Sequence, residues 1–338
     1  MDMFNPLVSI IIPVYNGANY LREAIDSVLG QSYNPIEVLV INDGSQDDGQ
    51  TERIALSYGD KLRYFTKPNG GVASALNLGI EQMRGEYFSW LSHDDVYFPD
   101  KVSAQIELLS HEEDKTAIVL SGWAVIDGKG AESYQVKPLN TYTKQQLGTP
   151  LFALLHGQVN GCSMLIHKSH FERAGVFDEH LPMTQDFDLW FRMMRDARVI
   201  CHTDALSMTR VHDQQDSRQR IHSHADESDA LWIHMMESLT DQEKIAMDGT
   251  VYEFYKNVYQ LLLSCSSYRG AIAHAKRKAS AELRKSNGGI SSYLLEYRKI
   301  LLPGYYTLFK KALWSLREFG LSSTIKRVSF ALHRKINS

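Results

Sequence analysis

Two adjacent aspartates, Asp94 and Asp95, are the clearest candidates for chemistry in the sequence. Neighbouring carboxylates raise each other's pKa unless something neutralises their charge. A divalent cation would do so, and carboxylate oxygens combined with phosphate oxygens suit Mg²⁺ or Mn²⁺. A solvated turn is an equally good interpretation of the pair alone, so its meaning depends on the residues around it.

The aspartates follow residues 87–91, an apolar run that predicts a β-strand. In the same way, Tyr15 follows a predicted strand at 8–12, and Asp43 follows one at 36–41. In open α/β sheets, ligands bind beyond the carboxyl ends of the strands. We therefore expect the three loops to converge on one crevice.

The fold class predicted from these runs is α/β. The strands at 8–12 and 36–41 flank a helical pattern at 18–29, which is a βαβ unit with parallel strands. Ser45 and Asp48, at capping-box spacing, predict the start of a second helix. Further strands are predicted at 62–65, 117–123, 162–166 and 206–211, and further helices at 72–83 and 187–195.

The length of 338 residues favours two parts. Helical periodicity replaces strand patterns after a polar stretch, and Thr240 with Glu243 forms a capping box there. We predict a catalytic domain at residues 1–222 and an α-helical domain at residues 223–338.

Composition narrows the class of protein. The net charge of −4 provides no global basic field for nucleic acid, so we expect no nucleic-acid partner. Three cysteines without a C-x-x-C pair suggest no disulfide framework and favour a reducing cytoplasm. No apolar run approaches the length of a membrane-spanning helix. We expect a cytoplasmic protein.

Several motifs, taken in order, resemble the inverting glycosyltransferases of family 2, which have the GT-A fold of a mixed sheet flanked by helices. The resemblance covers about the first 215 residues and rests on residues 8–16, 41–45, 69–71, 94–95, 162–165, 174–178 and 185–190. Any one of these motifs is weak, whereas their order makes chance similarity improbable. The resemblance implies transfer of a sugar from a nucleoside diphosphate to an acceptor hydroxyl, with inversion at the anomeric carbon.

The resemblance also implies donor-binding roles. Tyr15 matches an aromatic platform for the base, and Pro13 shapes its loop. Asp43 matches a carboxylate that accepts a hydrogen bond from the base, which favours a UDP-sugar, although an Asp-Gly turn has the same sequence. Asn69 and Gly70 either lie near the diphosphate or simply begin a helix.

For the carboxylate loop, the resemblance matches Asp94 to the ribose and Asp95 to the metal, Mn²⁺ or Mg²⁺. Ser92 stands where the family often has another acid, which leaves the second metal ligand open. His212 matches a histidine that returns to the metal or the diphosphate, and a surface histidine is the alternative.

Asp186 is the candidate general base, because it stands where the family carries its catalytic acid pair, with Gln185 replacing the first acid. A base here would take the proton of the acceptor hydroxyl. An acidic residue in the first turn of a helix also complements the helix dipole, and the two roles are compatible.

Four other classes of protein are alternatives to a glycosyltransferase. Ser92 and Gln185 motivate a non-catalytic nucleotide-sugar or glycan-binding protein. A sugar nucleotidyltransferase would need a glycine-rich basic loop near the N-terminus, which residues 13–17 do not provide. A glycosidase is disfavoured because adjacent aspartates do not have the spacing needed to face each other across a glycosidic bond. A dinucleotide oxidoreductase is disfavoured because the sequence lacks a G-x-G-x-x-G motif after the first predicted strand. The sequence names neither the sugar nor the acceptor.

The C-terminal stretch at 298–338 is basic, with nine Lys and Arg residues against one acid. Interleaved aromatic and aliphatic residues fit an interfacial helix on anionic lipid, and a bundle with a solvated basic face is the alternative. A peripheral enzyme on the inner face of the cytoplasmic membrane would suit a lipid-linked saccharide acceptor, as in the assembly of bacterial surface polysaccharides.

Overall fold

The computed structural model of the chain describes residues 4–213, 215, 224–264 and 268–285. Its central sheet begins with β1 (Val8–Val14) and β2 (Ile36–Asn42), which pair in parallel and are connected by α1 (Leu21–Leu29). All of β1 is buried, which explains its continuous apolar sequence. The predicted βαβ unit is confirmed.

Three more strands complete this sheet, in the order β3-β2-β1-β4-β8. β3 (Arg63–Thr66) and β4 (Tyr87–Trp90) are parallel to their neighbours, and β8 (Ile166–His167) pairs antiparallel to β4. The crossovers contain α2 (Gln50–Leu56) and α3 (Val72–Gln82). The sheet is therefore mixed, as the resemblance implied.

The register brings the ends of three strands to one edge. Val14 lies opposite Asn42 on β2, and Ile11 lies opposite Trp90 on β4. The backbone N–H of Asp43 donates to Val14 O at 2.8 Å, so the loops remain paired just beyond the strands. The loops after β1, β2 and β4 leave the sheet together.

A second sheet has the order β5-β9-β6-β7. It consists of β5 (Val96–Tyr97), β9 (Val199–Val211), β6 (Ile118–Asp127) and β7 (Glu132–Val136). β9 runs parallel to β6 and is much longer than the predicted strand at 206–211. Because β5 follows Asp95 directly and pairs Val96 with Met208, the end of β9 lies against the carboxylate loop.

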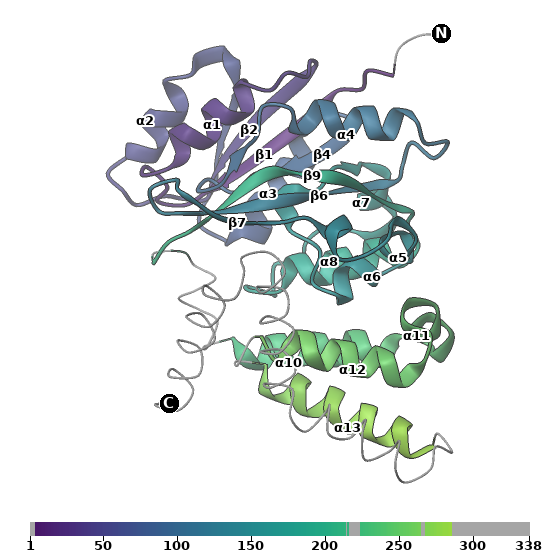
Figure 1. Cartoon of the computed structure of the whole chain (residues 1–338). Helices are drawn as coiled ribbons and strands as arrows, with labels where there is room; N and C mark the ends of the chain where they lie inside the picture. The colour runs from purple at the N-terminus through teal and green to yellow at the C-terminus, as the bar shows by residue number, and fades with distance from the viewer. Residues whose placement is uncertain (1–3, 214, 216–223, 265–267, 286–338) are drawn as a thin grey trace, which may run out of the picture.

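Helices cover both faces of the sheets (Figure 1). Alternate residues of β1 divide between two clusters: Ile10 and Ile12 pack with α1, while Ile11 packs with α3. The remaining helices of the α/β region are α4 (Lys101–Ser110), α5 (Lys144–Gly148), α6 (Phe152–Leu155), α7 (Ser169–Ala174) and α8 (Gln185–Met194). Short 3₁₀ turns are η1 (Gly59–Lys61), η2 (Pro138–Asn140) and η3 (Gly161–Ser163).

Two local predictions are only partly confirmed. The helix expected from Ser45 begins only at Gln50, because Asp48 and Gly49 both adopt positive φ angles, 53° and 72°, outside the right-handed helical region. In the strand expected at 162–166, Cys162 and Ser163 instead belong to η3, where the Asn160 side chain accepts the backbone N–H of Cys162, and only Leu165 and Ile166 form β pairs. Local side-chain hydrogen bonds override the apolar pattern there.

The region after β9 contains α10 (Ala225–Ser238), α11 (Asp241–Asp248), α12 (Val251–Leu262) and α13 (Arg269–Lys285). The capping box of Thr240 and Glu243 is confirmed. Buried side chains of these helices share one hydrophobic cluster with α3 and α8. The predicted boundary at 222 and the basic stretch at 298–338 lie outside the described residues.

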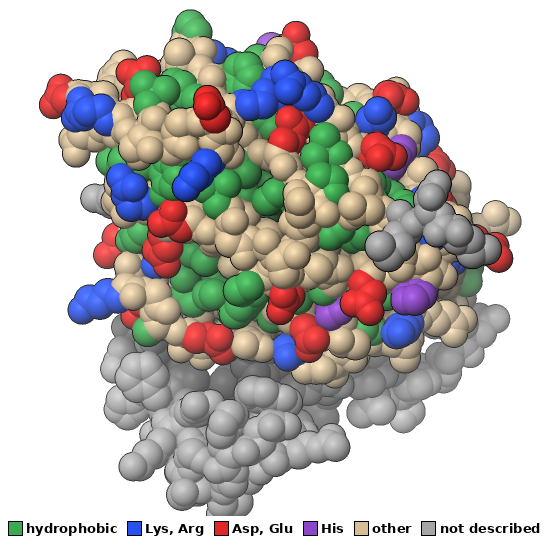
Figure 2. Space-filling view, turned by 90° about the horizontal axis from the view of Figure 1, so that it is seen from above, with side chains coloured by type: hydrophobic (Ala, Val, Ile, Leu, Met, Phe, Trp, Pro, Cys, Tyr) green, Lys and Arg blue, Asp and Glu red, His purple; other side chains and the backbone are tan. Residues whose placement is uncertain are grey.

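The surface carries both signs of charge. On the face seen in Figure 2, acidic and basic side chains are interspersed among apolar ones, consistent with the small net charge of −4. Among the helices that the structure describes, none combines the length and apolar character needed to cross a bilayer.

Candidate active site

The three predicted loops contact one another. The backbone N–H of Asn16, after β1, donates to Ser45 Oγ at 2.9 Å, and Asn16 Oδ1 accepts the N–H of Gln46 at 2.7 Å. The third loop is equally close, because a Cβ on Gly17 would lie 2.5 Å from Cδ2 of His93. The convergence predicted from the strand ends is therefore present.

Asp43, directly after β2, has 2% of its surface exposed. Lys67 Nζ donates to Oδ1 at 2.8 Å, and the backbone N–H groups of Gly70 and Gly71 donate to the carboxylate at 3.0 and 2.7 Å. Gly44, at φ +71°, permits this approach, because a Cβ there would lie 2.7 Å from Asn69 N. Asp43 thus organises the loop that contains Asn69 and Gly70.

Lys67 is a site residue that the sequence did not reveal. It lies two residues before Asn69 in a polar turn after β3, where no periodicity or motif distinguishes it. Its ion pair with Asp43 spans 24 residues and depends on the parallel pairing of β2 and β3. Only the fold brings the two together.

Tyr15 and Pro13 flank the end of β1. Pro13 is buried in the strand, whereas Tyr15 is 43% exposed, unusually open for a large ring. The turn continues through Asn16, whose φ of 49° directs the chain away from the sheet. An exposed ring beside the Asp43 loop is available for stacking against a planar ligand.

Asp94 and His212 form the second part of the site. Nε2 of His212 lies 3.0 Å from Oδ2 of Asp94, and both side chains are largely buried. The ring of Tyr20 lies beside the imidazole, at 5.1 Å between centroids. His212 therefore returns to the carboxylate loop, where it contacts Asp94 rather than Asp95.

Asp95 points into the protein and is 5% exposed. Its Oδ1 accepts the backbone N–H of Arg210 at 2.8 Å, and its Oδ2 accepts the thiol of Cys162 at 3.2 Å. Burial, together with the charge of Asp94, raises the pKa of Asp95 to about 8. Both oxygens of Asp95 are thus engaged inside the fold.

Arg210 ties this loop to the rest of the domain. Its side chain is 2% exposed, and its Nε donates to Asp94 O at 2.8 Å. A second nitrogen pairs with Glu23 at 2.7 Å, and the guanidinium lies 4.5 Å from the centre of the Tyr20 ring. The sequence pattern does not indicate Arg210, Tyr20 or Glu23 as site residues, because an arginine within an apolar strand pattern gives no sign of its partners.

Asp186 occupies the first turn of α8 and is half-buried. Burial raises the pKa of its carboxyl group to about 6, and its Oδ1 accepts the N–H of Phe187 at 2.8 Å. The preceding loop is tied to α3, because the Asn77 amide both donates to Phe177 O, at 2.9 Å, and accepts the N–H of Phe177, at 3.0 Å. No hydrogen bond or ion pair joins Asp186 to the other predicted site residues, all of which the structure describes.

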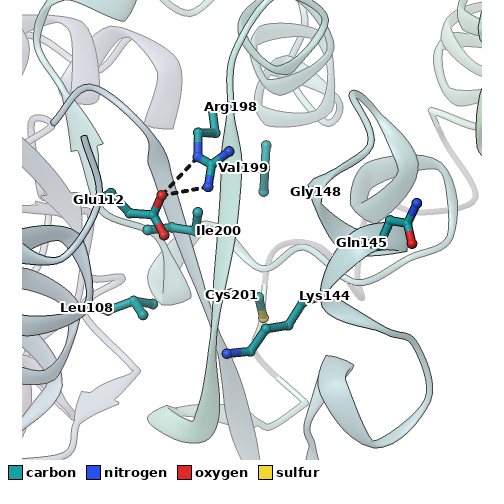
Figure 3. A pocket seen from close by; sticks show the side chains of 9 residues that line it. All are labelled: Leu108, Glu112, Lys144, Gln145, Gly148, Arg198, Val199, Ile200 and Cys201. Carbon is teal, nitrogen blue, oxygen red and sulfur yellow. Dashed lines mark hydrogen bonds and ion pairs between the residues drawn. The ribbon is translucent and has the colours of Figure 1, made fainter. Parts of the chain in front are cut away.

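A separate hollow of about 380 Å³ lies between the end of α4, α5 and the start of β9 (Figure 3). Arg198 and Glu112 form an ion pair of 2.6 Å at its wall. Because β6 pairs Leu120 with Cys201 at the hollow and Ile126 with Arg210, the hollow lies roughly 20 Å from the carboxylate loop. None of the predicted site residues lines it.

Relatives of the chain are glycosyltransferases. Residues 9–173 match the family model described as glycosyl transferase family 2. An uncharacterized glycosyltransferase of Rickettsia typhi is 44% identical over 331 residues, covering 97% of this chain and 96% of that protein. The chain spans only 43% to 49% of the length of three further Rickettsia relatives.

Solved structures share the fold. S. aureus TarS 1-349 in complex with UDP-GlcNAc has a TM-score of 0.55 at 15% identity, covering 82% of this chain and 92% of that chain. The mannosyltransferase PcManGT from Pyrobaculum calidifontis, in complex with GDP-Man and Mn²⁺, has a TM-score of 0.55 at 18% identity, covering 97% and 84%. With a matching family model and a relative similar over nearly its whole length, the chain belongs to glycosyl transferase family 2.

Proposed function

We propose that the chain transfers a sugar from a nucleoside-diphosphate donor to a hydroxyl group of a saccharide or a lipid-linked saccharide, with inversion at the anomeric carbon. The observation that carries the proposal is the convergence of the Asp43 loop with the Asp94–His212 contact beside the exposed Tyr15 ring. The Tyr15 ring and the Asp43 loop suit the base of a nucleotide, and the Asp94–His212 contact suits a cation bound to the diphosphate. The helix bearing Asp186 is tied by its preceding loop to α3, which begins at Val72 beside the Asp43 loop.

Tyr15 would stack on the base, and Asp43 would accept a hydrogen bond from a ring N–H, as in uracil. Three donors of the chain already surround the Asp43 carboxylate, so a base would have to share its oxygens. A UDP-sugar is our favoured donor. GDP-mannose is the alternative to test, because the structurally similar mannosyltransferase binds it.

Asp94 and His212 are our revised candidates for a Mn²⁺ or Mg²⁺ site. One carboxylate and one imidazole 3.0 Å apart fit part of the coordination shell of such an ion, and diphosphate oxygens would supply more ligands. Asp95, expected from sequence to bind the metal, has both oxygens hydrogen-bonded inside the fold. When bound, the cation would neutralise charge that develops on the leaving diphosphate.

Asp186 would act as general base. The oxygen of the acceptor hydroxyl attacks the anomeric carbon while the bond from that carbon to the diphosphate oxygen breaks, and its electron pair leaves with the nucleoside diphosphate. The hydroxyl proton passes to the Asp186 carboxylate. A pKa raised to about 6 by burial makes this carboxylate a stronger base than an exposed aspartate while leaving it ionised at neutral pH.

Donor turnover tests this proposal. Wild type is incubated with UDP-hexoses and with GDP-mannose in the presence of Mn²⁺ and saccharide acceptors, and release of the nucleoside diphosphate is measured. We expect turnover of at least one donor and its loss in Asp186→Asn, which should still bind the nucleotide. Nucleotide binding without turnover of any donor would favour the non-catalytic binding protein, and formation of a nucleotide sugar from a nucleoside triphosphate would favour the nucleotidyltransferase.

A further inference from the structure

The helical region after β9 contacts α8 at both ends and along its side. Glu227 of α10 reaches the residues just before the helix, and the Phe187 ring lies 6.0 Å from that of Trp232. At the other end, Arg195 donates to Glu243 at 2.8 Å. The helix that carries Asp186 is therefore held by residues outside the α/β region.

Glu227 makes the most specific of these contacts. Its Oε1 accepts three hydrogen bonds, from the backbone N–H of Met183 at 3.1 Å, the N–H of Thr184 at 2.9 Å and the hydroxyl of Thr184 at 2.8 Å. Thr184 is the N-cap residue of α8, yet its side chain makes no capping hydrogen bond. Its hydroxyl is donated to Glu227 instead, so a carboxylate from another helix fixes the start of α8.

We propose that Glu227 is a positioning residue for Asp186, an inference that rests on the proposed function. Asp186 is only two residues beyond Thr184, so fixing the Met183–Thr184 backbone fixes where the first turn of α8 begins and where the Asp186 carboxylate points. A misplacement of about 1 Å in a catalytic group can cost on the order of 100-fold in rate. A negative charge before the first turn also stabilises the helix through its dipole.

The helical region is then part of the catalytic unit. Two contacts fix the rotation of α8 about its axis: the Phe187–Trp232 ring contact and the Arg195–Glu243 ion pair. Glu227 fixes the position of the first turn of α8. The sequence offers no sign of this role, because Glu227 lies 43 residues after Thr184 in a stretch without a motif.

The test compares Glu227→Ala, Glu227→Gln and Glu237→Ala. A glutamine oxygen can accept the same hydrogen bonds, so Glu227→Gln should rescue. Glu237 is a matched control on the same helix, since its hydrogen bonds go to Tyr255 of α12 and to His274 and Lys278 of α13. Each variant is measured for amide hydrogen exchange at residues 183–188, for UDP affinity, and for kcat and KM with the donor that wild type turns over.

We expect Glu227→Ala to speed exchange at 183–188 and to lower kcat about tenfold or more, with UDP affinity and donor KM close to wild type. In Glu227→Gln, both the exchange rate at 183–188 and kcat should be close to wild type. Glu237→Ala should change neither of them. Unchanged exchange or unchanged kcat in Glu227→Ala would overturn the inference, as would equal effects in Glu237→Ala. If wild type turns over no donor, the proposed function fails, and exchange alone shows whether Glu227 holds the start of α8.

Discussion

His212 places its Nε2 atom 3.0 Å from the Oδ2 atom of Asp94, across a separation of 118 residues. The contact exists because β5 follows the carboxylate loop and pairs with the end of β9. It changes the interpretation of the aspartate pair: Asp94 faces His212, while Asp95 is a buried anchor.

Asp94→Asn and His212→Ala should each weaken Mn²⁺-dependent binding of UDP by about tenfold or more, because each removes a ligand of the proposed metal site. Asp95→Asn should have a smaller effect. Both oxygens of Asp95 are hydrogen-bonded inside the fold, to the Arg210 N–H and to the Cys162 thiol, and do not belong to the proposed metal site. Calorimetric titration of UDP with and without Mn²⁺ measures the difference, and the opposite ranking of the two aspartate variants would restore Asp95 as the ligand.

The rate should depend on the ionisation of Asp186. A base must be deprotonated to accept a proton, and burial raises its pKa to about 6, so kcat should be constant above that pH and fall as the pH drops through it. The pH dependence of kcat for the accepted donor measures this. A kcat that is flat down to pH 4.5, or turnover retained in Asp186→Asn, would exclude Asp186 as the base.

Gly44→Ala should weaken UDP binding and lower the melting temperature by several degrees, about 1 to 3 kcal/mol in stability. A Cβ at this position would lie 2.7 Å from Asn69 N, in addition to the strain of a φ of +71°. Gly59→Ala is the matched control, because Gly59 has a φ of +56° and open space around it. Thermal denaturation and UDP titration of both variants isolate the effect of the close approach, and equal effects would show that backbone strain alone matters.

Lys101 should make the stability of the fold depend on pH. Its ammonium group is fully buried and donates to Ser89 Oγ, Gln105 Oε1 and Met164 O, and burial lowers its pKa from 10.5 to about 7. Between those values the unfolded chain binds more protons than the folded one, so stability increases with pH.

In Lys101→Met this dependence should disappear. The melting temperature of wild type minus that of the variant should therefore increase from pH 7 to pH 9.5. A difference that stays constant across this range would mean that Lys101 keeps its proton when folded.

The basic stretch at 298–338 lies outside the described residues, and its membrane role remains a prediction from sequence. An interfacial role predicts that the full chain floats with vesicles containing anionic lipid and that a chain truncated after residue 296 remains at the bottom of the gradient, whereas a solvated basic face predicts no flotation of either chain. High salt should release the full chain. Equal recovery of both chains in the soluble fraction would favour a solvated helical surface.

Much of the fold could be predicted because buried parallel strands leave continuous apolar runs, as at residues 8–14. The convergence of Tyr15, Asp43 and Asp94 followed from strand ends alone. The partners of these residues could not be predicted. Arg210 and His212 lie beside the aspartates because β9 pairs with β5. β5 has only two residues, too few to leave a pattern in the sequence.

Other contacts depend on packing that sequence does not encode locally. Lys67 meets Asp43 only after β2 and β3 pair, and Glu227 meets Thr184 only after α10 packs beside α8. The late start of the helix expected from Ser45 has a local cause instead. Two residues with positive φ delay its start to Gln50.

Calorimetric titration of the wild-type protein with UDP and with GDP, in the presence and absence of Mn²⁺, tests the central claim most directly. A site formed by Asp43, Asp94 and His212 for a nucleoside diphosphate and its cation predicts saturable binding of one nucleotide, UDP by preference, strengthened by Mn²⁺. Failure of both nucleotides to bind at millimolar concentration, with the metal present, would contradict the account.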